Sequence, residues 1–192
     1  MANARAICWA PVGNTRHDAT GLEHLLLTAG AADSVVLAFD EADSPFRLTY
    51  RLTWDESWQL RVAELAVATG KITRSLSLRT DGQGHWRHRD GPIIDDLDGC
   101  LDVDIWPTPF TNTFPIRREA MEVGERREIR VAWIHAPELT VQAQRQAYTR
   151  LAGRLYRFET LDGSDFSAEL SVDEDGIVLD YPTLFRRVSA EE

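Results

Sequence analysis

The chain has 192 residues, of which 43% are hydrophobic and 27% are charged, and its formal net charge is −10. A chain of this length favours one domain, residues 1–192, which can bury a core without a disulfide or a structural metal. The acidic balance disfavours nucleic acid and anionic membrane surfaces as partners, because both carry negative charge.

Period-two alternation of apolar and polar residues begins with residues 46–54 and predicts a strand with one buried face. The turn at residues 55–57 leads into a second strand, whose alternation changes phase and predicts a β-bulge near Ala63 and Glu64. In the following run, Arg74 occupies a position of the apolar face. A buried cation there would need an acidic partner or an anionic ligand.

Further alternating runs continue to the end of the chain and are separated by Asp-Gly turn signals. Evenly spaced strands joined by such turns indicate antiparallel pairing rather than a wound parallel sheet. The later runs cover residues 101–105, 129–133, 156–158, 166–172 and 177–181.

One segment, from Thr140 to Ala152, has the character of a helix. Thr140 is a suitable N-cap, Tyr148 is one of the apolar positions, and Gly153 can end the helix. A single helix among many strands usually covers a curved sheet. We therefore expect a mainly β fold, with a many-stranded antiparallel sheet rolled around one α-helix as a β-roll or half-barrel.

The densest polar motif lies between Asp95 and Arg118. Asp102 and Asp104 are two residues apart on a predicted strand and so share one face. Two such carboxylates could divide the roles of acid and base or bind a cation. Alternatively, they form a polar outer face or pair with Arg117 or Arg118.

The segment after this strand contains prolines at positions 107, 109 and 115, which restrict the backbone and favour one rigid loop shape. Thr111 and Asn112 offer short polar side chains that can bond loop backbone or a ligand. Arg117 and Arg118 would point to opposite faces if the backbone is extended.

These residues resemble a family named putative glycolipid-binding proteins. The resemblance covers nearly the whole chain and is carried by residues 99–104, 108–118, 131–134, 146–149 and 173–182. It implies a spiral β-roll around one helix, similar in shape to the periplasmic lipoprotein carriers. It implies no catalytic residues, and a family name based on shape does not fix a function.

Three hypotheses remain open. The first is a binding protein that holds a small amphiphile, such as a glycolipid, in a cavity between sheet and helix, with the segment from Thr108 to Arg118 at its mouth. The second is a cofactor-free enzyme that uses Asp102 or Asp104 as a general base. In the third, the motif only stabilises the fold. The candidate ligand-binding residues are Asp102, Asp104, Thr111, Asn112, Arg117, Arg118, Arg74 and Tyr148.

We expect neither a metal site nor a cofactor. The acidic stretches at residues 95–98 and 173–176 each lack a ligand that a calcium loop requires. Cys8 and Cys100 are too few for a disulfide framework and fit no zinc spacing. No apolar run reaches the ~20 residues of a membrane helix, and the first 27 residues lack a signal-peptide pattern. These features predict a cytoplasmic protein.

Overall fold

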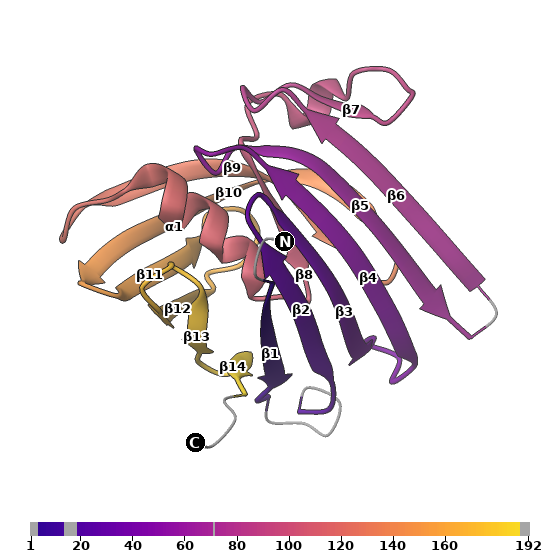
Figure 1. The fold of residues 1–192 in the computed structure, drawn as a ribbon, viewed down its shortest axis with the longest axis horizontal. Coiled ribbons are helices and arrows are strands. Elements are labelled where there is room, and N and C mark those ends of the chain that lie inside the picture. The colour runs from indigo at the N-terminus through magenta and orange to yellow at the C-terminus, as the bar shows by residue number, and fades with distance from the viewer. Residues whose placement is uncertain (1–3, 14–18, 71, 189–192) are drawn as a thin grey trace.

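The computed structural model describes residues 4–13, 19–70 and 72–188, which form one curved sheet of fourteen strands (Figure 1). The strands are β1 (Arg5–Pro11), β2 (Leu22–Thr28), β3 (Ala31–Phe39), β4 (Pro45–Trp54), β5 (Leu60–Thr69), β6 (Ile72–Thr80), β7 (Trp86–His88), β8 (Asp102–Trp106), β9 (Arg126–His135), β10 (Thr140–Ala152), β11 (Leu155–Thr160), β12 (Ser167–Val172), β13 (Val178–Tyr181) and β14 (Phe185–Arg187).

The strand order is β7-β6-β5-β4-β3-β2-β1-β14-β13-β12-β11-β10-β9-β8, so β7 and β8 are the two edges of an unclosed sheet. Two antiparallel meanders meet where β1 pairs with β14. The predicted mainly β, rolled antiparallel sheet is therefore confirmed. One pair differs from the expectation, because β8 runs parallel to β9 after the chain crosses over from β7.

The predicted helix from Thr140 to Ala152 is wrong, because this segment is the strand β10. It pairs antiparallel with β9 in continuous register from Thr140 opposite His135 to Thr149 opposite Arg126, and it also pairs with β11. A helix this short would depend on packing for its stability. Pairing with strands on both sides satisfies the same backbone groups and overrides the weak helical pattern.

The α-helix of the described chain is α1 (Thr113–Glu119), preceded by the 3₁₀ turn η2 (Phe110–Asn112); a second such turn, η1 (Asp95–Leu97), lies before β8. The proline-rich segment thus forms helical turns rather than an extended loop. Pro115 is tolerated because it lies in the first turn, where its missing N–H has no intrahelical acceptor.

Helix α1 lies across the hollow side of the sheet (Figure 1). Phe114 belongs to a core cluster formed mainly by β1–β5 and β8, and its ring packs edge-on against Trp54 at a centroid distance of 5.3 Å. Ile116 belongs to a second cluster formed mainly by β9–β14. The helix therefore joins the cores of the two halves of the roll.

Two further expectations change in detail. The predicted bulge lies at Arg61, slightly before Ala63, because Thr53 pairs with Val62 while Trp54 pairs with Leu60. Arg74 is exposed rather than buried. It lies on β6 near Ile72, which is 54% exposed. At this end of β6, the residues of the apolar face are therefore exposed to solvent instead of packing in the core.

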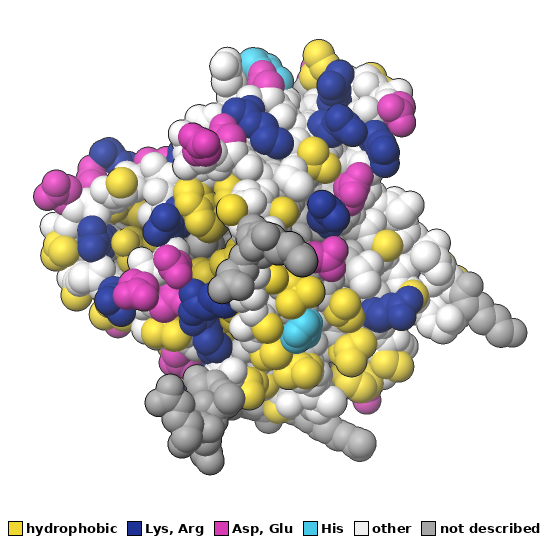
Figure 2. Space-filling model, in the orientation of Figure 1, with side chains coloured by type: hydrophobic (Ala, Val, Ile, Leu, Met, Phe, Trp, Pro, Cys, Tyr) yellow, Lys and Arg dark blue, Asp and Glu magenta, His cyan; other side chains and the backbone are white. Residues whose placement is uncertain are grey.

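The outward face of β2 and β3 is apolar, and Figure 2 shows a broad hydrophobic area over these strands. Leu22, Leu26 and Leu37 contribute to it and are between 42% and 51% exposed. Because side chains alternate along a strand, the residue between Leu22 and His24 points inward. Glu23 is therefore directed into the interior, where it is only 3% exposed.

Candidate functional site

Two neighbouring pockets share a wall formed by Trp106, Leu184 and Phe185. The rings of Trp106 and Phe185 pack together, with centroids 5.9 Å apart. We call one of them the aromatic pocket; it is lined by side chains of β8–β11, β13 and β14 and of the segments between strands. We call the other the Glu23 pocket; it is lined mainly by side chains of β1–β3. Their volumes are about 390 Å³ and 370 Å³, within the range of small-molecule sites.

The aromatic pocket has both apolar and polar side chains in its lining, and we call the polar set its polar floor. Its aromatic side chains are Trp106, Trp133, Phe158, Phe166, Tyr181 and Phe185. Its polar side chains are Asp104, Thr108, Asn112, Gln144, Gln146, Thr160 and Ser164. No arginine, lysine or histidine lines it among the described residues. Such a lining suits a neutral ligand with both apolar surface and hydroxyl groups.

Asp104 is the acidic residue of this polar floor. Its Oδ1 accepts a hydrogen bond from Thr111 Oγ1 at 3.0 Å, and its Oδ2 accepts one from Gln146 Nε2 at 2.7 Å. Burial raises the pKa of Asp104 above its usual value, and these two hydrogen bonds oppose that rise. Gln146 is 1% exposed, so the carboxyl group and its amide partner are held in a fixed arrangement.

Asn112 and Tyr148 form a second set of hydrogen bonds. The Tyr148 hydroxyl donates to Asn112 Oδ1 at 2.7 Å, and Asn112 Nδ2 donates to the carbonyl of Pro109 at 3.1 Å. Both side chains are buried, and Tyr148 reaches Asn112 from β10 rather than from a helix. The structure thus brings four predicted residues together: Asp104 and Asn112 line the pocket, while Thr111 and Tyr148 hold them.

Asp102 forms a separate buried ion pair with Arg118. Arg118 Nε donates to Oδ1 at 3.2 Å, and Arg118 Nη2 donates to Oδ2 at 2.6 Å. Asp102 is fully buried, and burial raises the pKa of its carboxyl group against the opposing effect of Arg118. The pairing that the sequence allowed is confirmed, and it fixes the end of α1 to β8.

Arg117 and Arg74 lie away from these pockets. The Arg117 guanidinium stacks over the Trp58 ring, with 5.1 Å from Cζ to the ring centroid. Because this segment is helical, Arg117 and Arg118 diverge around the helix instead of occupying opposite faces of a strand. Arg74 belongs to the exposed part of β6.

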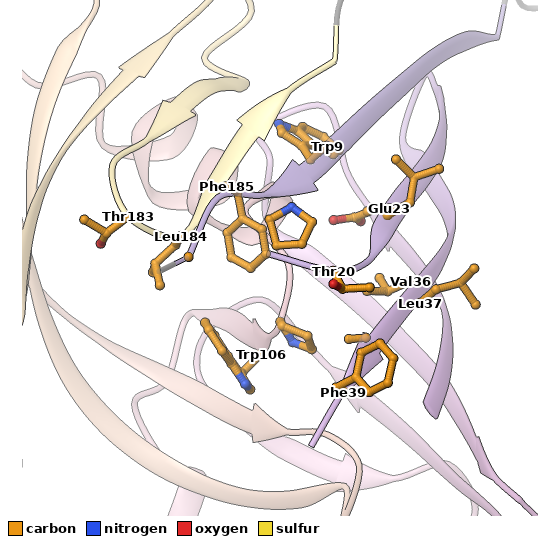
Figure 3. A pocket seen from close by; sticks show the side chains of 15 residues that line it. Trp9, Thr20, Glu23, Val36, Leu37, Phe39, Trp106, Thr183, Leu184 and Phe185 are labelled. Carbon is orange, nitrogen blue, oxygen red and sulfur yellow. The ribbon is translucent and has the colours of Figure 1, made fainter. Parts of the chain in front are cut away.

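The Glu23 pocket was not predicted from the sequence. Figure 3 shows the Glu23 carboxyl group extending from β2 toward Phe185, with Val36, Phe39 and Trp106 around the same space. The run from Leu22 to Leu27 offers one signal for this site, because Glu23 is an acidic residue within an otherwise largely apolar strand. Both faces of that strand carry leucines, so the sequence does not reveal which face is buried.

Glu23 has one satisfied and one unsatisfied oxygen. Oε1 accepts hydrogen bonds from Ser34 Oγ at 2.8 Å and from the Tyr50 hydroxyl at 2.5 Å. Oε2 is buried and has no hydrogen-bond partner among the described residues. Burial raises the pKa of Glu23 from 4.5 to about 7, although hydrogen bonds from Tyr50, Thr108 and Ser34 oppose the rise.

Neither a metal-binding group of side chains nor a membrane-spanning helix is found in the described part of the chain. No group of three or more histidine, cysteine or acidic side chains there could hold a metal ion. Within the same residues, no helix has the length and apolar character needed to cross a bilayer.

Comparison with known proteins places the chain in a family. Residues 7–187 match the sequence model of a family described as Putative glycolipid-binding. The chain is similar to a DUF1089 family protein from Pseudomonas aeruginosa of known crystal structure, with 48% identity, a TM-score of 0.87, and coverage of 92% of this chain and 96% of that one. No curated protein matches it. Because the family match spans nearly the whole chain, this protein belongs to the Putative glycolipid-binding family.

Proposed function

We propose that this protein binds a small amphiphile, of the glycolipid type, in the aromatic pocket. The observation that carries the proposal is the composition of the lining, in which six aromatic rings surround a floor of amide, hydroxyl and carboxyl groups. Aromatic faces stack on sugar rings or pack against acyl chains, and the polar side chains can bond head-group hydroxyls. The family description supports the same class of ligand.

Asp104 and Asn112 contribute directly to this site, and Thr111 and Tyr148 position them. Their mutual hydrogen bonds hold the polar floor in place before a ligand arrives, which reduces the entropy lost on binding. We assign Asp102 and Arg118 to the support of α1 beside the pocket. Arg117 and Arg74 line neither of the two pockets, so the proposed site does not require them.

The enzymatic alternative has less support at Asp102 and Asp104. Asp102 is fully buried in its ion pair with Arg118 and lines neither pocket, so a substrate in either pocket would not reach it. Asp104 lines the aromatic pocket, but each of its oxygens already accepts one hydrogen bond from the protein, and its remaining lone pairs suit a bond from a ligand hydroxyl. A general base must come within hydrogen-bond reach of the proton it removes. The single-domain organisation and the cytoplasmic location stay predictions.

Organic extraction of freshly purified protein, followed by mass spectrometry, tests the proposal. Ser164→Trp should fill the pocket, because Ser164 lines it from an exposed position. Ser167→Trp is the matched control, since Ser167 is exposed on β12 and does not line the pocket. We expect an amphiphile from the parent protein and from Ser167→Trp, and little from Ser164→Trp. An empty parent protein, or equal recovery from both variants, would refute the proposal.

A further inference from the structure

The Glu23 pocket contains a buried acid, and no described residue of its lining carries a positive charge. The other two buried carboxyl groups near the pockets are satisfied, Asp102 by Arg118 and Asp104 by Gln146 and Thr111. Glu23 Oε2, in contrast, has no hydrogen-bond partner within the described chain and belongs to a side chain that lines a cavity. An unpaired buried polar atom is costly, so its retention needs an explanation.

Three hydroxyl groups offset part of the cost of a negative charge on the buried Glu23. Ser34 and Tyr50 both donate to Oε1. The Thr108 hydroxyl lies 3.2 Å from the Tyr50 oxygen and donates to it, since the Tyr50 proton is directed to Glu23. Hydrogen bonds to the ionised form favour that form. With Oε1 occupied by donors, Oε2 is the oxygen left without a partner among the described residues, on a side chain that lines the pocket.

The surroundings of Oε2 favour a cation as that ligand. No arginine, lysine or histidine lines the pocket among the described residues. Arg187 lies over the Trp9 ring but is outside the lining and is paired with Asp173. Phe39, Trp106 and Phe185 present aromatic surface, which attracts ammonium groups. The net charge of −10 also draws cations toward the protein.

We infer that the Glu23 pocket binds a small organic amine, whose ammonium group pairs with Glu23 Oε2 while its carbon chain lies against the aromatic walls. This site is distinct from the aromatic pocket and goes beyond the proposed function. Tyr50 is the titratable side chain bonded to Glu23, and burial raises its pKa well above 10, so it stays protonated. Ser34, Thr108, Trp9 and Phe185 carry no charge.

Isothermal titration with n-hexylamine tests this site, with n-hexanol as the neutral probe of the same length. The buffer should be phosphate, because amine buffers would compete. An alkylammonium group keeps its proton up to about pH 10, and Glu23 is the one ionisable side chain among the described residues that line the pocket. A change in amine affinity between pH 6 and 8 that Glu23→Gln removes is therefore due to Glu23. With its pKa at about 7, hexylamine affinity should rise about tenfold over this range. Hexanol affinity should change little.

Two variants and one control variant complete the test. Glu23→Gln keeps a carbonyl oxygen for Ser34 and Tyr50 but removes the charge, so hexylamine should bind it no better than hexanol at any pH. Ala38→Trp keeps Glu23 but narrows the pocket that Ala38 lines, and it should lose both probes. Glu41→Gln, at an exposed position, is the control and should bind like the parent.

The inference is wrong if the parent binds hexylamine and hexanol equally at pH 8, or if Glu23→Gln keeps the parental affinity and pH dependence. Octyl glucoside binding by Glu23→Gln distinguishes the two proposals. Loss of amine binding with retained glucoside binding separates the Glu23 pocket from the aromatic pocket, whereas failure of glucoside binding in the parent counts only against the proposed function.

Discussion

At pH 8, the Glu23→Gln variant is expected to be more stable than the parent protein by about 3 kcal/mol, because burial raises the pKa of Glu23 from 4.5 to about 7. Between these two values, the folded state holds a proton that the unfolded chain has released. The contribution of Glu23 to the free energy of unfolding is therefore greatest below pH 4.5. It falls as the pH rises and reaches its minimum above pH 7. Glutamine cannot ionise and does not pay this cost.

Urea denaturation at pH 4.5, 6 and 8 measures the effect. The difference in unfolding free energy between Glu23→Gln and the parent should be small at pH 4.5 and largest at pH 8. Taking this difference cancels the contributions of other acids, including Asp102 and Asp104. The exposed control, Glu41→Gln, should differ from the parent by a small amount at every pH. A difference for Glu23→Gln that does not vary with pH would show that Glu23 ionises normally.

The second large effect is expected at the buried ion pair. Arg118, whose side chain is 13% exposed, pairs with the fully buried Asp102 and with the partly exposed Glu119. Asp102→Asn removes the buried one of these two charges and should destabilise the fold by about 3 kcal/mol. The double variant Asp102→Leu with Arg118→Met should recover most of this loss, because no unpaired charge remains buried.

The exposed pair of Arg157 and Glu169 provides the comparison. Both side chains are about half exposed, at 46% and 50%, and Glu169→Gln should cost less than about 1 kcal/mol. Urea denaturation of all the variants at pH 7 compares the two pairs. If Asp102→Asn unfolds at the same urea concentration as the parent, the pair does not stabilise the contact between α1 and β8.

The sheet could be predicted from the sequence because alternation is a local property. Residues 46–54 show it clearly, and they form most of β4. The segment from Thr140 to Ala152 could not be assigned in this way. Its residues Gln146, Ala147 and Tyr148 are buried in succession, so β10 does not show strict alternation. Its neighbours β9 and β11 determine its conformation, and the pairing partners of a strand are not written in its own residues.

The candidate site could be predicted only where its residues are close together in the sequence. Asp104 and Asn112 belong to a dense polar motif that is visible in the sequence, and they line the aromatic pocket. Glu23 and Tyr50 are 27 residues apart and meet only because β2, β3 and β4 are adjacent.

For Arg74, the local pattern was visible in the sequence but predicted the wrong environment. Arg74 occupies a position of the apolar face in the alternating pattern, which predicted burial. Because β6 lies next to the edge strand of the sheet, the side chain is exposed instead.

The central claim, that the aromatic pocket holds an amphiphile, is tested most directly by titrating the parent protein, Ser164→Trp and Ser167→Trp with n-octyl β-D-glucoside below its micelle concentration. Glucose serves as the head-group control. The account predicts saturable binding of octyl glucoside by the parent and by Ser167→Trp, much weaker binding by Ser164→Trp, and negligible binding of glucose, because the apolar chain supplies most of the buried area. Equal binding by all three proteins, or no binding by the parent, would contradict it.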